Sequence, residues 1–260
     1  MEKVTSKDGT IIVFERSGKG PVVLLVGGIL GDRSQQAPLA ALLADHFTVF
    51  NYDRRGHGES GDTPPYAVER EIEDLEAMIK EAGGSAFVYG TSGCAVLVLE
   101  AAAHGLAPKM KKLAMWEPPY IVDDSRPPAP RDYKEQLTEL LAAGRRGDMV
   151  ELFFTKAVGL PIEFVAQMRQ APFWSAQEAL AHTLVYNAMI MGDFSLPTQR
   201  IATVNLPILV IDGGETAWLT NAAQAVAEVL PNAQRHTLKG QPHNVAPEAI
   251  APVLIEFFKE

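Results

Sequence analysis

A serine and the chain's single cysteine stand two positions apart at the junction of a strand-like and a helix-like segment. The stretch 87–100 is FVYGTSGCAVLVLE, in which an apolar run ends in GTSGC and helical periodicity follows at once. A nucleophile held on such a strand-to-helix turn can attack a carbonyl carbon, and the free N–H groups of the helix can stabilise the negative charge that develops. Ser92 and Cys94 are therefore two candidate nucleophiles.

The small neighbours of this turn favour Ser92. In the G-x-S-x-G pattern of a nucleophile elbow, the residues two positions either side of the nucleophile lie against backbone and must be small. Around Ser92 they are Gly90 and Cys94, and a free cysteine behaves as a compact buried hydrophobe. Around Cys94, one neighbour would be the β-branched Val96. We predict Ser92 as the nucleophile and the amide of Gly93 as an oxyanion donor.

Strand patterns alternate with helix patterns on both sides of this turn, which predicts an α/β fold with a doubly wound, mostly parallel sheet. Residues 120–200 interrupt the alternation with proline-broken helical segments, so we predict a core of 1–119 and 201–260 with a helical cap inserted at 120–200. Ser34 is the expected N-cap of the first helix. The predicted strands are 10–18, 21–28, 47–53, 86–90, 111–117, 207–214 and 233–240, and the predicted core helices are 34–46, 68–84, 94–105, 219–232 and 247–260.

A glycine-rich loop, GHGESG at 56–61, formally matches a dinucleotide-binding pattern. That function requires a helix to open at the loop and receive the pyrophosphate. Here Pro64 and Pro65 follow, which keep the segment extended or turned. We therefore predict no cofactor, and a structural turn in which Asp53, Arg54 and Arg55 form local ion pairs.

Four motifs in the same order resemble the α/β-hydrolase superfamily across nearly the whole chain. They are PVVLLVGGIL at 21–30, YDRRGHGESG at 52–61, VYGTSGCA at 88–95 and LKGQPHNVAPEAIAPVLIEFF at 238–258. The resemblance implies a triad in the order serine, acid, histidine, with His243 as the general base in the loop before the last helix. His236 is expected to be structural, because it lies inside a predicted strand. His46, His57, His104 and His182 have no motif support.

The acid departs from the usual family pattern. The family usually places an aspartate a few residues after the strand PILVIDGG, and that position is Thr216 here. Some members take the acid from the loop after the sixth strand, where Glu117 stands in LAMWEPPY. We predict Glu117 as the acid that holds His243, with Asp212 and Glu215 as alternatives.

The oxyanion loop also departs from the pattern, since Gly27-Gly28 replaces the usual His-Gly. The second oxyanion amide is therefore expected from Gly28 or Ile29. The missing histidine removes one hydrogen-bonding brace and leaves the backbone donor in place.

These residues predict a cofactor-independent and metal-free serine hydrolase that acts through an acyl-enzyme. We expect a small, largely apolar ester or lactone as substrate. The Ser-His-Glu arrangement is similar to that of fungal-type zearalenone lactonases, which favours a lactone. An apolar substrate pocket is predicted from side chains of the cap and of the nearby strand end: Trp116, Phe153, Phe154, Phe173, Trp174, Tyr186, Met189 and Met191.

Two alternatives stay open from the residues alone. A C–C bond hydrolase or a perhydrolase would use the same triad. A non-hydrolytic protein of the same fold would bind a small molecule or template a cyclisation.

Composition limits the other function classes. A net charge of −9 disfavours nucleic acid and anionic membranes as partners, which leaves a small-molecule substrate, with a homodimer left open. One cysteine excludes an internal disulfide. The N-terminal segment has no basic-then-apolar signal pattern and no run approaches the ~20 apolar residues of a membrane span, so we expect a soluble cytoplasmic protein.

Overall fold

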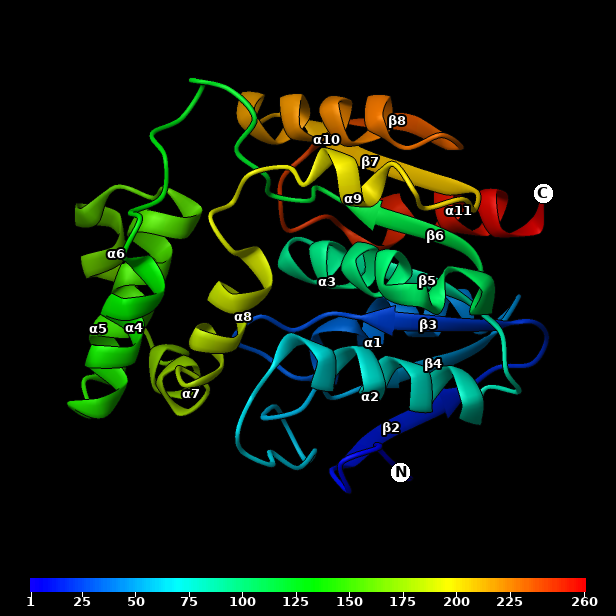
Figure 1. Cartoon of the computed structure of the whole chain (residues 1–260), viewed down its shortest axis with the longest axis horizontal. Coiled ribbons are helices and arrows are strands. Elements are labelled where there is room, and N and C mark those ends of the chain that lie inside the picture. Colours follow the sequence, from blue (N-terminus) through cyan, green and yellow to red (C-terminus); the bar gives the residue numbers. More distant parts are fainter.

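The computed structural model describes residues 1–260 and is built on one eight-stranded sheet of order β1-β2-β4-β3-β5-β6-β7-β8 (Figure 1). The β1–β2 and β2–β4 pairs are antiparallel and all later pairs are parallel. The predicted mostly parallel α/β sheet is therefore confirmed. The strands are β1 (Glu2–Thr5), β2 (Ile11–Ser17), β3 (Val22–Val26), β4 (Thr48–Tyr52), β5 (Ala86–Thr91), β6 (Met110–Trp116), β7 (Ile208–Gly214) and β8 (Ala233–Gln241).

Helices cover both faces of this sheet (Figure 1). Side chains alternate along a strand, so Val23 and Leu25 of β3 enter one apolar cluster while Leu24 and Val26 enter the other. This explains why the strand is apolar without alternation, because both of its faces are covered. The first face carries α1 (Ala37–Leu43) and α11 (Pro247–Lys259), and the second carries α2 (Val68–Glu81), α3 (Gly93–Ala101) and α10 (Ala217–Val229).

The start of the first helix differs from the prediction. A 3-10 turn, η1 (Arg33–Gln36), precedes α1, and its N-cap is Asp32 rather than Ser34. The Asp32 carboxylate accepts a hydrogen bond from the Ser34 amide at 2.8 Å. The prediction of Ser34 as the N-cap was therefore wrong. Asp32, two residues earlier, caps the turn by accepting from the backbone N–H of Ser34.

Only helices occur between β6 and β7, and most of them lie beyond the carboxyl ends of the strands (Figure 1). Among them, α8 packs against α2 and α3 and links this group to the sheet's core. No helix is long and apolar enough to cross a membrane. The helices of this segment are α4 (Tyr133–Ala142), α5 (Arg146–Leu152), the π-helical η4 (Phe153–Val158), α6 (Ile162–Met168), α7 (Trp174–Ala179), α8 (Thr183–Met191) and α9 (Thr198–Ile201), while η2 (Ala102–Leu106) and η3 (Ala107–Lys109) extend α3 towards β6.

The turn at 56–61 is anchored by buried ion pairs in its approach segment. Arg54 donates to both oxygens of Glu71 at 2.7 and 2.6 Å. Arg55 donates to both oxygens of Asp74 at 2.6 and 2.7 Å. Asp53 accepts hydrogen bonds from the amide and the guanidinium of Arg33. These pairs agree with a structural role for the turn, which Arg54 and Arg55 fasten to α2 and Asp53 fastens to η1.

His57, in the same turn, should make the fold sensitive to acid. Its Nδ1 lies 2.9 Å from the carbonyl oxygen of Arg55, and its buried Nε2 has no partner. Burial, with the nearby Arg54 cation, lowers the pKa of His57 from 6.5 to about 4. The unfolded chain therefore binds a proton that the native protein does not, so the free energy of unfolding falls as pH drops through this window. At about pH 4 the loss from His57 is roughly 3 kcal/mol.

Urea unfolding of the wild type and of His57→Gln, at about pH 7 and about pH 4, measures this effect. The variant should lose less stability on acidification than the wild type. Equal losses in both proteins would show that His57 does not carry the acid sensitivity.

Candidate active site

Ser92 lies on a sharp turn between β5 and α3. Its backbone has φ 55° and ψ −129°, a region that residues with a side chain rarely adopt. A Cβ on Gly90 would come within 2.7 Å of the Cys94 carbonyl oxygen and of the Val98 side chain. Glycine is therefore required at 90 for the helix to start so close to the strand. This is the elbow geometry expected from the sequence.

Two consecutive hydrogen bonds link Ser92 to His243 and His243 to Glu117. His243 lies in the loop between β8 and α11, with its Nε2 3.0 Å from the Ser92 Oγ. Its Nδ1 lies 2.6 Å from Oε2 of Glu117. With a proton on Nδ1, donated to the carboxylate, Nε2 is free to accept the serine proton. The arrangement can thus generate a serine nucleophile.

Glu117 is held firmly where β6 ends. It is 1% exposed, and its Oε1 accepts a hydrogen bond from the Gly213 amide at 3.0 Å. Its backbone, with φ 43°, is also in the left-handed region, and its amide donates to the Ile211 carbonyl at 2.8 Å. The fixed main chain and the bond to Gly213 hold the carboxylate in place for His243.

The other two predicted acids do not contact His243. Asp212 is fully buried and binds Arg235 at 2.9 Å, together with hydroxyls of Thr220 and Thr237. Glu215 is exposed and makes no ion pair. Of the three carboxylates considered, Glu117 alone lies against the histidine.

The predicted oxyanion loop runs past the elbow. Ile29 borders the same cavity as Ser92 and Gly93, and its side chain lies 2.6 Å from where a Cβ on Gly93 would stand. Gly28 has φ 95°, a conformation that favours glycine. The amides of Gly28 and Ile29 make no hydrogen bond with other backbone groups, so they remain candidate donors to an oxyanion.

A cavity of about 290 Å³ opens above Ser92 and His243. Apart from these two residues its wall is mostly apolar, with contributions from the helices between β6 and β7 and from the start of α10. The other lining residues are Ile29, Gly93, Pro119, Phe153, Ala157, Val158, Gly159, Leu160, Asn187, Met191, Phe194, Thr216, Trp218 and Leu219.

Among the predicted pocket residues, only Phe153 and Met191 line this cavity. Trp116 is fully buried and donates its indole N–H to the His243 carbonyl at 2.8 Å, and it does not border the cavity. Trp174 donates to Glu178 within the cap at 3.0 Å.

Two of the three predicted α8 residues lie elsewhere. Tyr186 stacks on Tyr66 and donates to Asp62, and Met189 borders a different cavity. The face of α8 that meets Ser92 carries the predicted Met191 together with Asn187, which was not predicted. Residues 187 and 191 are four positions apart, which places them on the same face of a helix. This spacing is the one sequence signal that could have grouped them, but using it required knowing which face of α8 points to the cavity.

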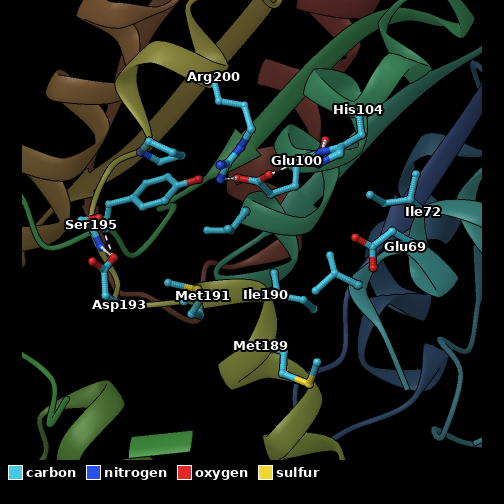
Figure 2. A pocket seen from close by; sticks show the side chains of 15 residues that line it. Glu69, Ile72, Glu100, His104, Met189, Ile190, Met191, Asp193, Ser195 and Arg200 are labelled. Carbon is cyan, nitrogen blue, oxygen red and sulfur yellow. Dashed lines mark hydrogen bonds and ion pairs between the residues drawn. The ribbon is translucent and has the colours of Figure 1, made fainter. Parts of the chain in front are cut away.

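The second cavity, about 370 Å³, lies between α2, α3 and the segment from Met189 to Arg200 (Figure 2). Figure 2 shows the Arg200 and Glu100 side chains pointing toward one another. Arg200 Nη2 donates to Glu100 Oε1 at 2.7 Å. His104 lies beside Glu100, with 3.6 Å between its Nδ1 and Oε2. The ion pair between Arg200 and Glu100 ties α9 to α3.

Cys94 is enclosed below the elbow. It is 1% exposed, and its Sγ accepts a hydrogen bond from Arg54 Nη1 at 3.3 Å. Burial raises the pKa of its thiol, which keeps it protonated and unreactive. The side chain therefore serves packing and one buried hydrogen bond.

Cys94→Ala should keep most of the activity and lose some stability. The change leaves one guanidinium N–H of Arg54 without its sulfur partner, at a cost of about 1–2 kcal/mol. Urea unfolding measures that loss beside a kinetic assay, and Cys94→Ser, which keeps an acceptor, should recover part of it. Abolished turnover in a folded Cys94→Ala protein would contradict our register for the elbow.

No three His, Cys, Asp or Glu side chains gather in a way that could hold a metal ion. The turn at 56–61 is followed by an extended segment, and α2 begins only at Val68, so α2 does not open at the turn. The chemistry available at the site is that of the hydrogen-bonded serine, histidine and glutamate.

Comparison with known proteins places this chain among hydrolases. A family model described as "Alpha/beta hydrolase family" matches residues 22–253. The solved structure of an alpha/beta hydrolase from Sphaerobacter thermophilus DSM 20745 is 59% identical, with a TM-score of 0.93, over 99% of this chain and 100% of that one. The enol-lactonase from Burkholderia xenovorans LB400 is 21% identical with a TM-score of 0.73, covering 100% of both chains, and thus shares the fold.

A curated relative matches over a shorter stretch. The "Uncharacterized hydrolase YraK" of Bacillus subtilis (strain 168) is 36% identical over 96 residues. That alignment spans 35% of this chain and 35% of the relative's own length.

Proposed function

Because this chain belongs to the alpha/beta hydrolase family, we propose that it is a serine hydrolase that cleaves a small, largely apolar ester or lactone. One observation carries the proposal: Ser92, His243 and Glu117 form a continuous hydrogen-bonded chain at the floor of an apolar cavity. A simple binding protein has no need of such a chain, so the geometry favours catalysis over the non-hydrolytic alternative.

In the proposed mechanism, the Ser92 Oγ attacks the acyl carbon while His243 Nε2 takes the hydroxyl proton. Glu117 stabilises the imidazolium that forms. The amide of Gly93 and that of Gly28 or Ile29 donate to the tetrahedral oxyanion. His243 then protonates the leaving group, and water activated by the same histidine releases the acid from Ser92.

The cavity supports a small substrate. Its volume of about 290 Å³ is near the lower end of ligand pockets, which span roughly 300–1,000 Å³. Its mostly apolar wall favours an acyl group that is small and largely apolar. An enol-lactonase shares this fold, and the position of Glu117 after β6 supports extending lactone cleavage to this chain as part of the proposal.

A fluorophosphonate probe tests the mechanism directly. It should label the wild-type protein on the peptide that contains Ser92, and short-chain p-nitrophenyl esters should be hydrolysed. Relative rates then rank the reactions that share this triad. They are measured on a panel of esters, lactones and C–C bond cleavage substrates, and under conditions that allow peracid formation. Absence of both labelling and hydrolysis in the folded protein would reject the serine hydrolase proposal.

A further inference from the structure

Asn187 is an unexpected polar side chain in the wall of the catalytic cavity. It lies on α8 and borders the cavity together with Ser92, Gly93 and His243. It is 5% exposed, and the cap side chains around it, such as Met191, are apolar. A buried amide in such surroundings is costly unless its hydrogen bonds are made.

Within the protein those bonds are not made. The Oδ1 atom of Asn187 is fully enclosed and has no hydrogen-bond partner. The Nδ2 group also makes no hydrogen bond, but it is not among the enclosed atoms, so it keeps accessible surface. Because the residue borders the cavity, that surface faces the place where a substrate would sit.

Contact with Gly93 sets the orientation of this amide. Oδ1 lies 2.6 Å from the position that a Cβ on Gly93 would occupy, so it rests against a Cα hydrogen. A Cα–H group is a weak donor that favours an oxygen over an NH2 group at this contact. The oxygen is therefore held against the elbow, and Nδ2 is directed into the cavity.

The place of Asn187 also selects one side of the substrate. It meets Gly93, the first candidate oxyanion donor, on the side that the Ile29 side chain also occupies. The leaving group must instead depart beside His243 Nε2, which supplies its proton. Asn187 is thus placed to contact the acyl part of a substrate.

We propose that Asn187 determines specificity, by donating a hydrogen bond from Nδ2 to an acceptor oxygen that the acyl group carries two or three bonds from the scissile carbonyl carbon. This inference rests on the serine hydrolase proposal and narrows its substrate class to oxygen-substituted esters and lactones. A purely alkyl acyl group leaves the buried Asn187 amide without a hydrogen-bond partner. A pocket that must bond a substrate group discriminates strongly against substrates that lack the group.

Isosteric ester pairs test the proposal. p-Nitrophenyl methoxyacetate and butyrate differ by one oxygen in place of a methylene, and 3-methoxypropionate and pentanoate move that oxygen one bond further. For each ester, kcat/KM is divided by the spontaneous hydrolysis rate, which removes the difference in reactivity. The wild type should prefer the ether ester of at least one pair by about tenfold or more.

Asn187→Leu, of similar size and without a donor, should lose that preference by about tenfold while retaining the fluorophosphonate label on Ser92. Asn205→Leu is the matched control, since Asn205 is an exposed residue that bonds only to Asn232. It should keep the wild-type preference. Thermal unfolding of both variants verifies the fold.

Each result has one meaning. A preference unchanged in Asn187→Leu, no preference in the wild type, or an equal loss on both members of a pair overturns the inference. An equal loss on both members of a pair would mean that Asn187 stabilises the oxyanion or the fold, and does not recognise the acyl oxygen. If the wild type hydrolyses no ester through Ser92, the hydrolase proposal itself fails, and the substrate inference falls with it.

Discussion

Ser92→Ala should lower kcat for p-nitrophenyl esters by about 10,000-fold or more, in a protein that folds as the wild type does. The Ser92 Oγ is 3.0 Å from His243 Nε2, within reach of its base. The only thiol, Cys94, is enclosed under the elbow and bonded to Arg54, so it cannot take over the attack. Residual hydrolysis would come from binding and the oxyanion amides alone.

Cys94→Ala is the matched control for this experiment, since it removes the neighbouring candidate nucleophile. Fluorophosphonate should label Cys94→Ala and fail to label Ser92→Ala. Equal labelling of Ser92→Ala and wild type, or activity within tenfold of wild type, would remove serine attack from the mechanism.

The second large effect is expected from Glu117→Gln, which should lower kcat by about 1,000- to 10,000-fold. The glutamine has nearly the same shape and can still accept from the Gly213 amide. It cannot stabilise the imidazolium with a negative charge, and its amide can hold His243 in the wrong tautomer. Steady-state kinetics on one ester measures the loss, which should appear in kcat rather than in KM.

Asp212→Asn provides the comparison. Its carboxylate binds Arg235, so the change should weaken that ion pair and leave kcat within a few-fold of the wild type. Glu215→Gln, at an exposed position, should change little. A larger fall in kcat for Asp212→Asn than for Glu117→Gln would reject Glu117 as the acid.

The fold was largely predictable, because its signals are local. Strands such as Val22–Val26 are buried on both faces and so are apolar throughout, and the small residues around Ser92 mark a turn that backbone contacts demand. The four residues of β1 were missed, since so short an edge strand has no distinctive pattern. The start of the first helix was displaced because two polar residues competed for its cap.

The residues that line the cavity were harder to predict than Ser92, His243 and Glu117. Aromatic residues such as Trp174 and Tyr186 are apolar enough for a pocket, but packing turned them towards Glu178 and Tyr66. Which side of a cap helix faces the sheet depends on tertiary contacts that periodicity within one helix does not contain. Asn187 was missed for the same reason, because a lone polar residue in an apolar helix gives no sign of what it faces.

The neighbouring residues Trp116 and Glu117 both form hydrogen bonds with His243. The indole holds the main-chain carbonyl of His243, while the carboxylate holds its ring. In the proposed mechanism the segment after β7 takes no part in proton transfer, and Thr216, Trp218 and Leu219, at the start of α10, line the cavity. We therefore expect that exchanging these lining residues changes the substrate range while the proposed proton relay stays intact.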